Sequence, residues 1–223
     1  MNQDFWHQRW LKGETGWHQG DINPHLQAYW PPPGVMPGAR VLAPLCGKSR
    51  DLLWLAGEGY RVLGVEISPL GVEAFFTENG LTPTISDEPP FTRYRVDQLE
   101  ILCGDFFALQ PEQVADVTAL FDRAALIALP LAMRAAYTHH LGTLLPRSVS
   151  GLLITLDYEQ TERAGPPFAV TDREVRALFA QRLSLTEIAA LDLFATIPRY
   201  REQGLTRMVE RVYALQPLPV PTS

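Results

Sequence analysis

The sequence predicts an α/β protein built on a doubly wound sheet of mostly parallel strands. Short apolar runs of strand length alternate with helical patterns from residue 40 onward, which is the order of successive strand–helix–strand units. Such units almost always connect parallel strands by right-handed crossovers. The chain has 223 residues, of which 46% are hydrophobic and 20% charged, and this size and composition suit one globular domain over residues 1–223.

The first two strand–helix units lie between residues 40 and 79. Arg40–Pro44 and Arg61–Glu66 are apolar runs that we expect to form buried strands. Ser49–Glu58 carries an apolar face and predicts a helix. Pro69–Asn79 predicts a second helix, because a proline occupies its first turn and Gly80 stands just past its end.

The rest of the chain continues this alternation after a polar stretch at residues 81–98. We expect that stretch to be an insertion or a hairpin, in which Phe91–Val96 alternates as a surface strand does. Further strands are expected at Leu99–Cys103, Val117–Asp122, Gly151–Asp157, Leu183–Ala190 and Thr206–Leu215. Helices are expected at Pro130–Leu145 and Val170–Gln181.

Both ends of the chain differ from this central pattern. Trp6 and Trp10 are four residues apart and would share one face of a helix. Asn23 can cap a short helix that begins at Pro24. We interpret residues 1–34 as a helical lid over the main domain, and the proline-rich residues 216–223 as a flexible tail.

Charge and cysteine content exclude several classes of protein. A net charge of −6 lacks the general attraction to phosphate that dominates nucleic-acid affinity, so we expect no nucleic-acid partner. Cys46 and Cys103 offer neither a disulfide framework nor metal-ligand spacing, and no H-E-x-x-H cluster is present, so we expect no metal. No run approaches the ~20 apolar residues of a membrane helix. We therefore expect a soluble cytoplasmic monomer without a membrane partner.

The loop after the first predicted strand contains a single glycine, Gly47. Ligands of open parallel sheets bind outside the carboxyl ends of the strands. A dinucleotide site would show G-x-G-x-x-G here, so a ligand without a pyrophosphate is favoured. Lys48 and Ser49 resemble the end of a phosphate-binding loop, but Leu42 stands where that motif needs its first glycine. A glycine that only ends the strand explains Gly47 equally well.

An acid, Glu66, ends the second predicted strand, 19 residues after Gly47. This spacing suits a carboxylate that accepts hydrogen bonds from a ribose diol. The alternative is a solvated acid at the end of a strand. Asp105, Asp122 and Arg123 follow other predicted strands, so they place further polar groups at the same rim of the sheet.

Several short segments together resemble the thiopurine S-methyltransferase family, from the first residues to about Tyr213. The most specific are the Gly-x-Thr-Gly-Trp-His pattern within Gly13–Gln19 and the Pro-Leu-Cys-Gly-Lys-Ser run of Pro44–Ser49. The other resembling segments are Trp10, Ile22–Pro24, Asp51, Trp54–Ala56, Val65–Ile67 and Asp122–Ala124. The short N-terminal extension is closer to the bacterial members.

The resemblance implies the class I methyltransferase fold, a sheet of seven mostly parallel strands with an antiparallel last strand, and the cofactor S-adenosylmethionine. It implies cofactor contacts at Trp10, Leu45, Glu66 and Arg123, with Gly104, Asp105 and Phe106 near the adenine. Gly47 is expected to bind the cofactor because of its place in the turn after the first strand. Arg123 would also face the methyl acceptor, and Arg199 matches a position that contacts substrate. The implied acceptors are aromatic or heterocyclic thiols, and bacterial members are also associated with selenium and tellurium compounds.

Two other classes of protein remain open from the sequence. A nicotinamide-dependent oxidoreductase would use a similar sheet, although the single glycine and the absence of a Tyr-x-x-x-Lys pair disfavour it. A ligand-binding module without enzymatic activity would keep the fold and transfer no methyl group.

Individual residues also keep a second interpretation. Phe106 could stack on adenine or belong to the core, and Trp10 could simply dock the N-terminal helix, although an indole face also suits a sulfonium cation. Cys46 is expected to be a small buried turn residue rather than a nucleophile. We expect His18 to order the lid loop and consider Asp157 a candidate for proton handling.

Overall fold

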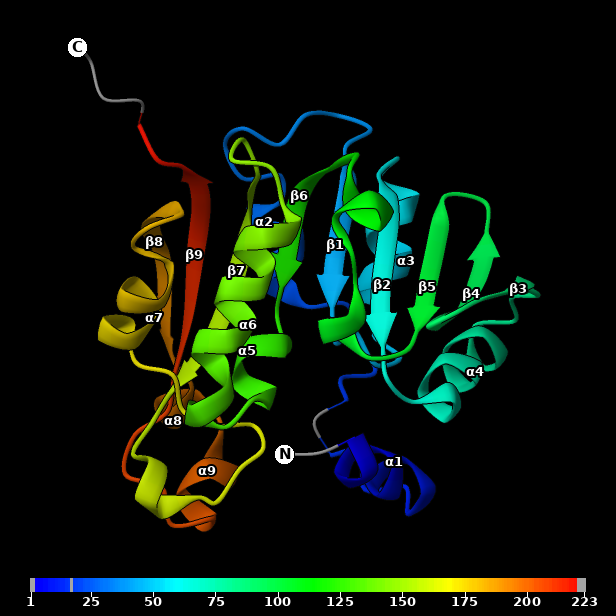
Figure 1. Ribbon diagram of the computed structural model, residues 1–223. Helices are drawn as coiled ribbons and strands as arrows, with labels where there is room; N and C mark the ends of the chain where they lie inside the picture. The colour runs from blue at the N-terminus through cyan, green and yellow to red at the C-terminus, as the bar shows by residue number, and fades with distance from the viewer. Residues whose placement is uncertain (1–2, 17, 220–223) are drawn as a thin grey trace.

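The computed structural model describes residues 3–16 and 18–219, whose strands lie side by side in one twisted sheet (Figure 1). The strands are β1 (Arg40–Pro44), β2 (Arg61–Glu66), β3 (Thr84–Glu88), β4 (Phe91–Val96), β5 (Leu99–Cys103), β6 (Val117–Asp122), β7 (Ser150–Asp157), β8 (Leu183–Asp192) and β9 (Val209–Pro217). Across the described residues these nine strands have the order β3-β4-β5-β2-β1-β6-β7-β9-β8.

The order of the strands reverses beside β1. In the described part of the chain the five neighbouring strands β5, β2, β1, β6 and β7 pair in parallel. The chain moves from β1 outward to β2 and β5, and then returns to the other side of β1 for β6 and β7. The topological switch therefore lies between β1 and β6, where a ligand is expected outside the carboxyl ends of the strands. β9 runs antiparallel to both neighbours, β7 and β8, which confirms the expected antiparallel last strand.

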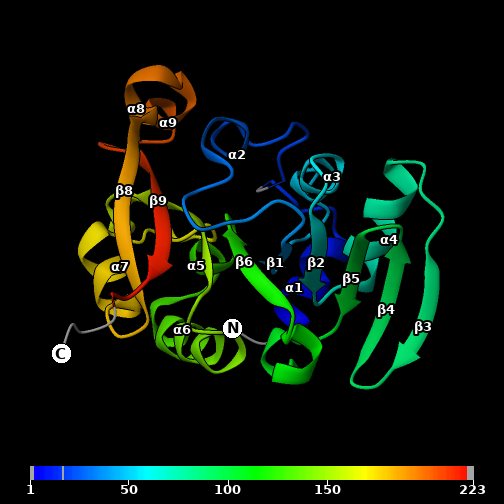
Figure 2. The ribbon, with the colours of Figure 1, turned by 90° about the horizontal axis from the view of Figure 1, so that it is seen from above.

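Helices cover both faces of the sheet (Figure 2). One face carries α2 (Pro24–Tyr29), α3 (Asp51–Gly57) and α4 (Pro69–Glu78), and the opposite face carries α5 (Ala125–Ala128), α6 (Leu131–Leu144) and α7 (Asp172–Phe179). A mostly parallel sheet with helices on both faces is the doubly wound α/β fold that the sequence predicted.

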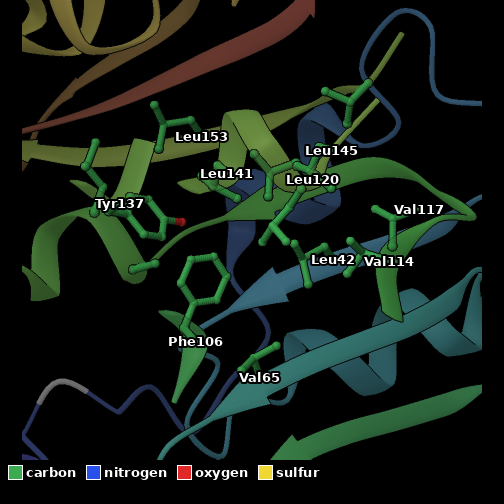
Figure 3. Packing of buried hydrophobic residues seen from close by; sticks show 14 of the residues in the cluster. Leu42, Val65, Phe106, Val114, Val117, Leu120, Tyr137, Leu141, Leu145 and Leu153 are labelled. Carbon is green, nitrogen blue, oxygen red and sulfur yellow. The ribbon is translucent and has the colours of Figure 1, made fainter. Parts of the chain in front are cut away.

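The sheet separates two hydrophobic cores, as β1 illustrates. Successive residues of a strand point to opposite faces, so Val41 and Ala43 join the core under α3 and α4, whereas Leu42 joins the core under α6. Figure 3 shows part of this second core, in which the rings of Phe106 and Tyr137 point toward each other with centroids 5.3 Å apart. Each large apolar side chain that is buried contributes roughly 1.5–3 kcal/mol, so these cores hold the strand ends in place.

Residues 81–98 form a hairpin of β3 and β4, which was one of the two expected alternatives. β4 pairs antiparallel with both β3 and β5, so the hairpin extends the sheet by two strands beyond the seven that the resemblance implied. β4 is not a surface strand, because β3 covers its edge and the side chains of Phe91 and Tyr94 are buried in opposite cores.

The predicted helix limits lie within two residues of the observed ones, whereas the end of the chain departs more from prediction. β9 begins at Val209 rather than Thr206, because Thr206 donates its N–H and its hydroxyl to Glu162 at 2.9 and 2.7 Å. β9 also includes Gln216 and Pro217, which pair with the start of β8, so these two residues belong to the sheet and not to the predicted tail. Residues 220–223 of that tail lie outside the described residues.

Two short helices that the sequence did not predict connect β8 to β9. They are α8 (Leu193–Thr196) and α9 (Pro198–Glu202). Pro198 at the start of α9 was the local signal for this helix, since proline is favoured in the first turn.

The N-terminal arm contains the predicted helices. α1 (Gln3–Leu11) lies against α4. Asn23 caps α2 as predicted, because its side chain accepts the N–H groups of His25 at 2.9 Å and Leu26 at 3.4 Å. Trp17, part of the N-terminal motif, lies outside the described residues. No helix within residues 3–16 and 18–219 is long and apolar enough to cross a lipid bilayer.

Candidate active site

A cavity of about 610 Å³ opens at the carboxyl ends of the parallel strands. Its walls come from the N-terminal arm, from the loops after β1, β2, β5, β6 and β7, and from α9. Its lining includes every residue that the sequence predicted for cofactor or substrate binding: Trp10, Leu45, Gly47, Glu66, Gly104, Asp105, Phe106, Arg123 and Arg199. Residues from both ends of the chain therefore meet in this cavity.

The turn after β1 has a left-handed backbone at two positions. The φ angles are 50° at Leu45 and 55° at Gly47. Glycine adopts this region freely, whereas the leucine conformation costs about 1–3 kcal/mol. The Gly47 N–H donates to Oε2 of Glu66 at 2.8 Å, and the Cys46 N–H donates to the Val65 carbonyl at 3.0 Å. These bonds hold the turn against the end of β2.

The carboxylate of Glu66 is buried at the end of β2, where the residue is 6% exposed. Its Oε1 accepts the Ser68 N–H at 2.8 Å, its Oε2 accepts the Gly47 N–H, and the Trp10 side chain supplies a further hydrogen bond. Burial raises the pKa of Glu66 to about 6, although these hydrogen bonds lower it in part. At pH 7 the group is anionic, and a carboxylate retains acceptor capacity beyond three bonds.

The indole of Trp10 packs over the glycine turn and the start of α4. A Cβ on Gly71 would lie 2.9 Å from Cζ2 of Trp10, and a Cβ on Gly47 would lie 3.6 Å from the same atom. Only glycine at position 71 permits this close approach. Trp10 therefore docks α1 against α4 and also lines the cavity. Its packing role is observed, and its role in cofactor binding stays a prediction.

The segment after β5 forms the next part of the wall. A Cβ on Gly104 would lie 2.5 Å from Cδ1 of Phe91, so packing requires glycine here. Asp105 caps the 3-10 turn that follows, since its side chain accepts the Phe107 N–H at 2.9 Å. Phe106 is 4% exposed and belongs to the core of Figure 3, and it lines the cavity as well.

Arg123 is held by an acid to which the sequence attached no role. The Nε of Arg123 donates to Oδ2 of Asp51 at 3.1 Å, and its Nη2 donates to Oγ of Ser49 at 2.8 Å. Asp51 opens α3, is 1% exposed, and accepts the Asn23 N–H at 2.7 Å. Asp51 therefore joins the N-terminal arm to the residue that follows β6. The motif around the glycine turn contained Asp51, but no local pattern linked it to Arg123.

Asp122 does not line the cavity, although the sequence placed it at the same rim. Its Oδ2 accepts the Tyr137 hydroxyl at 2.7 Å, and its Oδ1 accepts the N–H groups of Ala125 and Leu126 at 3.2 and 3.3 Å. Burial raises the pKa of Asp122 to about 6, and these hydrogen bonds oppose the rise in part. Asp122 thus supports the start of α5 directly after Arg123.

The expected proton-handling role of Asp157 is wrong. Arg207 donates two hydrogen bonds to its carboxylate at 2.9 and 2.8 Å, and Arg211 donates a third at 2.9 Å. Burial alone would raise the pKa of Asp157, but the two guanidinium groups outweigh burial and lower the pKa. The carboxylate also lies outside the cavity lining. It holds β7 and β9 together instead.

Cys46 and His18 differ in their relation to the cavity. The Sγ of Cys46 packs toward Gly64 and is not part of the lining, and burial raises the pKa of this thiol well above its usual value. Both facts favour the structural interpretation over a nucleophile. His18 lines the cavity, and burial together with Lys48 lowers its pKa, so its imidazole is neutral at pH 7.

The part of the cavity lined by residues after β6 has an apolar wall and two more arginines. Its apolar wall includes Ile127 and Met133. Arg199 lies on α9 with its guanidinium carbon 5.6 Å from the ring centroid of Tyr200. Arg163, which follows the 3-10 turn Gln160–Glu162, lines the same cavity and had no signal in the sequence. We call this part of the cavity the acceptor end.

Solved structures of other proteins share the fold of this chain. A structure described as a SAM-dependent methyltransferase from Anabaena variabilis matches with a TM-score of 0.65 at 12% identity, covering 98% of this chain and 96% of that chain. The 1,6-didemethyltoxoflavin-N1-methyltransferase of Burkholderia thailandensis, crystallised with S-adenosylhomocysteine, matches with a TM-score of 0.62 at 15% identity, covering 96% and 87%. The fold is therefore that of S-adenosylmethionine-dependent methyltransferases.

Sequence comparison narrows this class to a family. The family model described as Thiopurine S-methyltransferase matches residues 1–217. A thiopurine S-methyltransferase of Pseudomonas fluorescens is 52% identical over 215 residues, covering 96% of this chain and 99% of that protein. One of Azotobacter vinelandii is 50% identical over 216 residues, covering 97% and 99%. The chain belongs to the thiopurine S-methyltransferase family, as its motifs predicted.

Proposed function

We propose that this chain transfers the methyl group of S-adenosylmethionine to the sulfur of aromatic and heterocyclic thiols. The observation that carries the proposal is the cavity, in which the buried carboxylate of Glu66 lies beside the glycine turn and the acceptor end is apolar with arginines. Membership of the family supports the same reaction, because the relatives bear the name thiopurine S-methyltransferase.

The residues around Glu66 fit the chemistry of S-adenosylmethionine. A buried carboxylate accepts hydrogen bonds from ribose hydroxyls, and the face of the Trp10 indole attracts a sulfonium cation. The single-glycine turn suits a ligand without a pyrophosphate. When bound, the cofactor supplies an electrophilic methyl group. We assign its binding to Trp10, Leu45, Gly47, Glu66, Gly104, Asp105, Phe106 and Arg123.

In this reaction the protein binds the two reactants, aligns them and shields them from water. Aromatic thiols are acidic enough to be largely thiolate near pH 7, so no strong base is required. Arg123 and Arg199 would favour an anionic acceptor by their charge. Alignment and exclusion of water can lower the barrier by roughly 7–11 kcal/mol. We therefore assign these arginines to the acceptor and assign no proton transfer to His18.

The proposal extends to selenium and tellurium compounds. Selenolates and tellurolates are softer nucleophiles than thiolates, and the same arginines would favour these anions by charge.

We also propose that residues 1–34 act as a lid on a single domain, which the packing of Trp10 on Gly71 supports. We propose that the protein works as a monomer in the cytoplasm.

A labelled-methyl transfer assay tests the reaction. Thiophenols, thiopurines, selenols and oxyanions of selenium and tellurium serve as acceptors, and phenols of the same ring structure serve as controls. We expect transfer to thiols and none to phenols. Binding of S-adenosylhomocysteine without transfer to any thiol would instead indicate a binding module.

Thermal unfolding distinguishes the methyltransferase from an oxidoreductase of similar fold. S-Adenosylhomocysteine at about 100 times its dissociation constant should stabilise the protein by about 2.7 kcal/mol, because a ligand that binds only the native state shifts unfolding by mass action. NAD should produce no shift. A shift with NAD and none with S-adenosylhomocysteine would contradict the proposal.

A further inference from the structure

Two guanidinium groups at the acceptor end carry a charge that no described residue neutralises. Neither Arg163 nor Arg199 forms an ion pair within residues 3–16 and 18–219, although both line the cavity. Arg123 differs, because Asp51 pairs with it at 3.1 Å. The two unpaired groups therefore make this end of the cavity locally positive.

Two acids near these arginines form hydrogen bonds to other residues. Glu210 lines the same cavity, but its Oε2 lies 2.7 Å from Nε2 of His25. Glu162 precedes Arg163 in the chain and accepts both hydrogen bonds of Thr206. Neither acid is paired with Arg163 or Arg199, so both guanidinium groups can bind an anion from outside the chain.

The loop that carries Arg163 has a fixed backbone. Nε2 of Gln160 donates to the Arg163 carbonyl at 2.6 Å, and Oε1 of Gln160 accepts the Ala169 N–H at 2.9 Å. The Tyr158 hydroxyl donates to the Pro167 carbonyl at 2.6 Å. Two side chains at the start of the loop therefore hold backbone groups along its length, which reduces the entropy that Arg163 would lose on binding a ligand.

The segments that carry Arg163 and Arg199 pack together below the sheet in the view of Figure 1. Aromatic residues from both segments belong to one buried cluster. The hydrogen bonds between Glu162 and Thr206 join them directly. The two arginines are thus presented to the same end of the cavity by one packed unit.

We propose that Arg163 and Arg199 bind a carboxylate on the methyl acceptor, so that the preferred acceptors are aromatic thiols with an acidic ring substituent. The inference rests on the proposed function, because the sulfur must face the Glu66 end, where Arg123 is available to the thiolate. The ring then lies along the apolar wall that includes Met133. Guanidinium groups suit this role because they bind carboxylates through paired, charge-assisted hydrogen bonds.

A matched pair of acceptors tests the proposal by kinetics. 4-Mercaptobenzoate and 4-mercaptobenzamide have similar shapes and differ in the charge of the substituent. We expect the wild-type kcat/KM to favour the acid about tenfold, and Arg163→Gln or Arg199→Gln to remove most of this preference, because charge-assisted bonds are about twice as strong as neutral ones. Arg173→Gln, on an exposed part of α7 outside the cavity lining, should keep the preference.

Equal kcat/KM values for acid and amide in the wild type would overturn the proposal. A preference that survives Arg163→Gln unchanged would overturn the role of Arg163. Charge reversal in Arg163→Glu gives an independent check, since it should make the amide the better acceptor.

Direct binding separates this inference from the proposed function. Calorimetry measures the affinity of benzoate and benzamide for protein saturated with S-adenosylhomocysteine. We expect benzoate to bind about tenfold more tightly, less so at high salt, and to lose this advantage in Arg163→Gln. The S-adenosylhomocysteine affinity and melting temperature of that variant report its folding.

Failure of the proposed methyl transfer and failure of the proposed anion site would give different results in these two experiments. If no thiol is methylated but the benzoate preference depends on Arg163, the anion site stands and the proposed reaction falls. If thiols are methylated but benzoate and benzamide bind alike, the reaction stands and the anion site falls.

Discussion

At the scale of single residues, two buried carboxylates hold neighbouring segments of the site together. Glu66 accepts hydrogen bonds from the Gly47 N–H and from Trp10, and Asp51 accepts them from Arg123 and the Asn23 N–H. The sequence predicted the position of Glu66, because the end of a strand is a local feature. It did not predict that Asp51 binds Arg123, because the two residues lie 72 positions apart in the chain.

We predict that binding of S-adenosylhomocysteine requires Glu66 in its ionised form. Because burial raises the pKa of Glu66 to about 6, the carboxylate is protonated below that pH, and affinity should fall by up to about tenfold per pH unit. Glu66→Gln should bind about tenfold more weakly at pH 7 and lose most of this pH dependence. Calorimetry from pH 5 to 8 measures both, with the exposed Glu112→Gln as control. A constant wild-type affinity over this range would contradict the prediction.

Asp51→Asn should destabilise the fold at pH 7. The variant leaves the guanidinium of Arg123, whose side chain is 13% exposed, without a negative partner. Removing one member of a buried ion pair costs about 3 kcal/mol or more, and the free energy of unfolding in urea measures the loss. Asp21→Asn replaces an exposed acid of the same type and should change the stability by less than about 0.5 kcal/mol. Equal stability of the two variants would show that Asp51 does not hold Arg123.

At the scale of elements, the contact between α1 and α4 shapes the part of the cavity beside Glu66. The indole of Trp10 reaches the glycine turn only because α4 has Gly71 in its first turn. The sequence predicted both helices but not this contact, since the spacing of residues within a helix does not show which neighbour it meets.

Gly71→Ala should weaken the binding of S-adenosylhomocysteine by about tenfold with little loss of stability. The added Cβ would lie 2.9 Å from the indole and displace Trp10, whereas alanine is the better helix former by about 1 kcal/mol. Gly57→Ala is the matched control, because no atom lies within 4 Å of a Cβ at that end of α3. Calorimetry and thermal unfolding separate affinity from stability. If both variants bind like the wild type, the packing of Trp10 does not limit binding.

At the scale of the whole molecule, an ion-pair network joins the strands beside the acceptor end. Asp157 on β7 binds Arg211 on β9, and Arg211 in turn binds Glu187 on β8 at 2.6 Å. Arg207, just before β9, binds Asp157 as well. The network links the last three strands of the sheet, and α9, which lines the cavity, lies in the connection between β8 and β9.

Asp157→Asn should lower the free energy of unfolding by about 2 kcal/mol at pH 7, because the side chain of Arg211 is only 18% exposed and that of Arg207 is 48% exposed. The pKa of Asp157 is lowered in the folded protein, so its contribution is present above pH ~4 and is lost as the pH falls through the folded pKa. The difference from the wild type should therefore shrink toward pH 3. Urea unfolding at several pH values measures it against Asp87→Asn, an exposed control. A difference that grows at low pH would contradict the assignment.

Residues close together in the chain carry the signals for the alternation of strands and helices, the single-glycine turn, the acid at the end of β2 and the family, so local patterns predicted all four. The folded structure sets which distant groups pair. It paired Asp157 with two arginines, added the β3–β4 hairpin to the edge of the sheet, and brought Arg163 and Arg199 to one end of the cavity. These results depend on strand register and packing between elements, which local patterns do not encode.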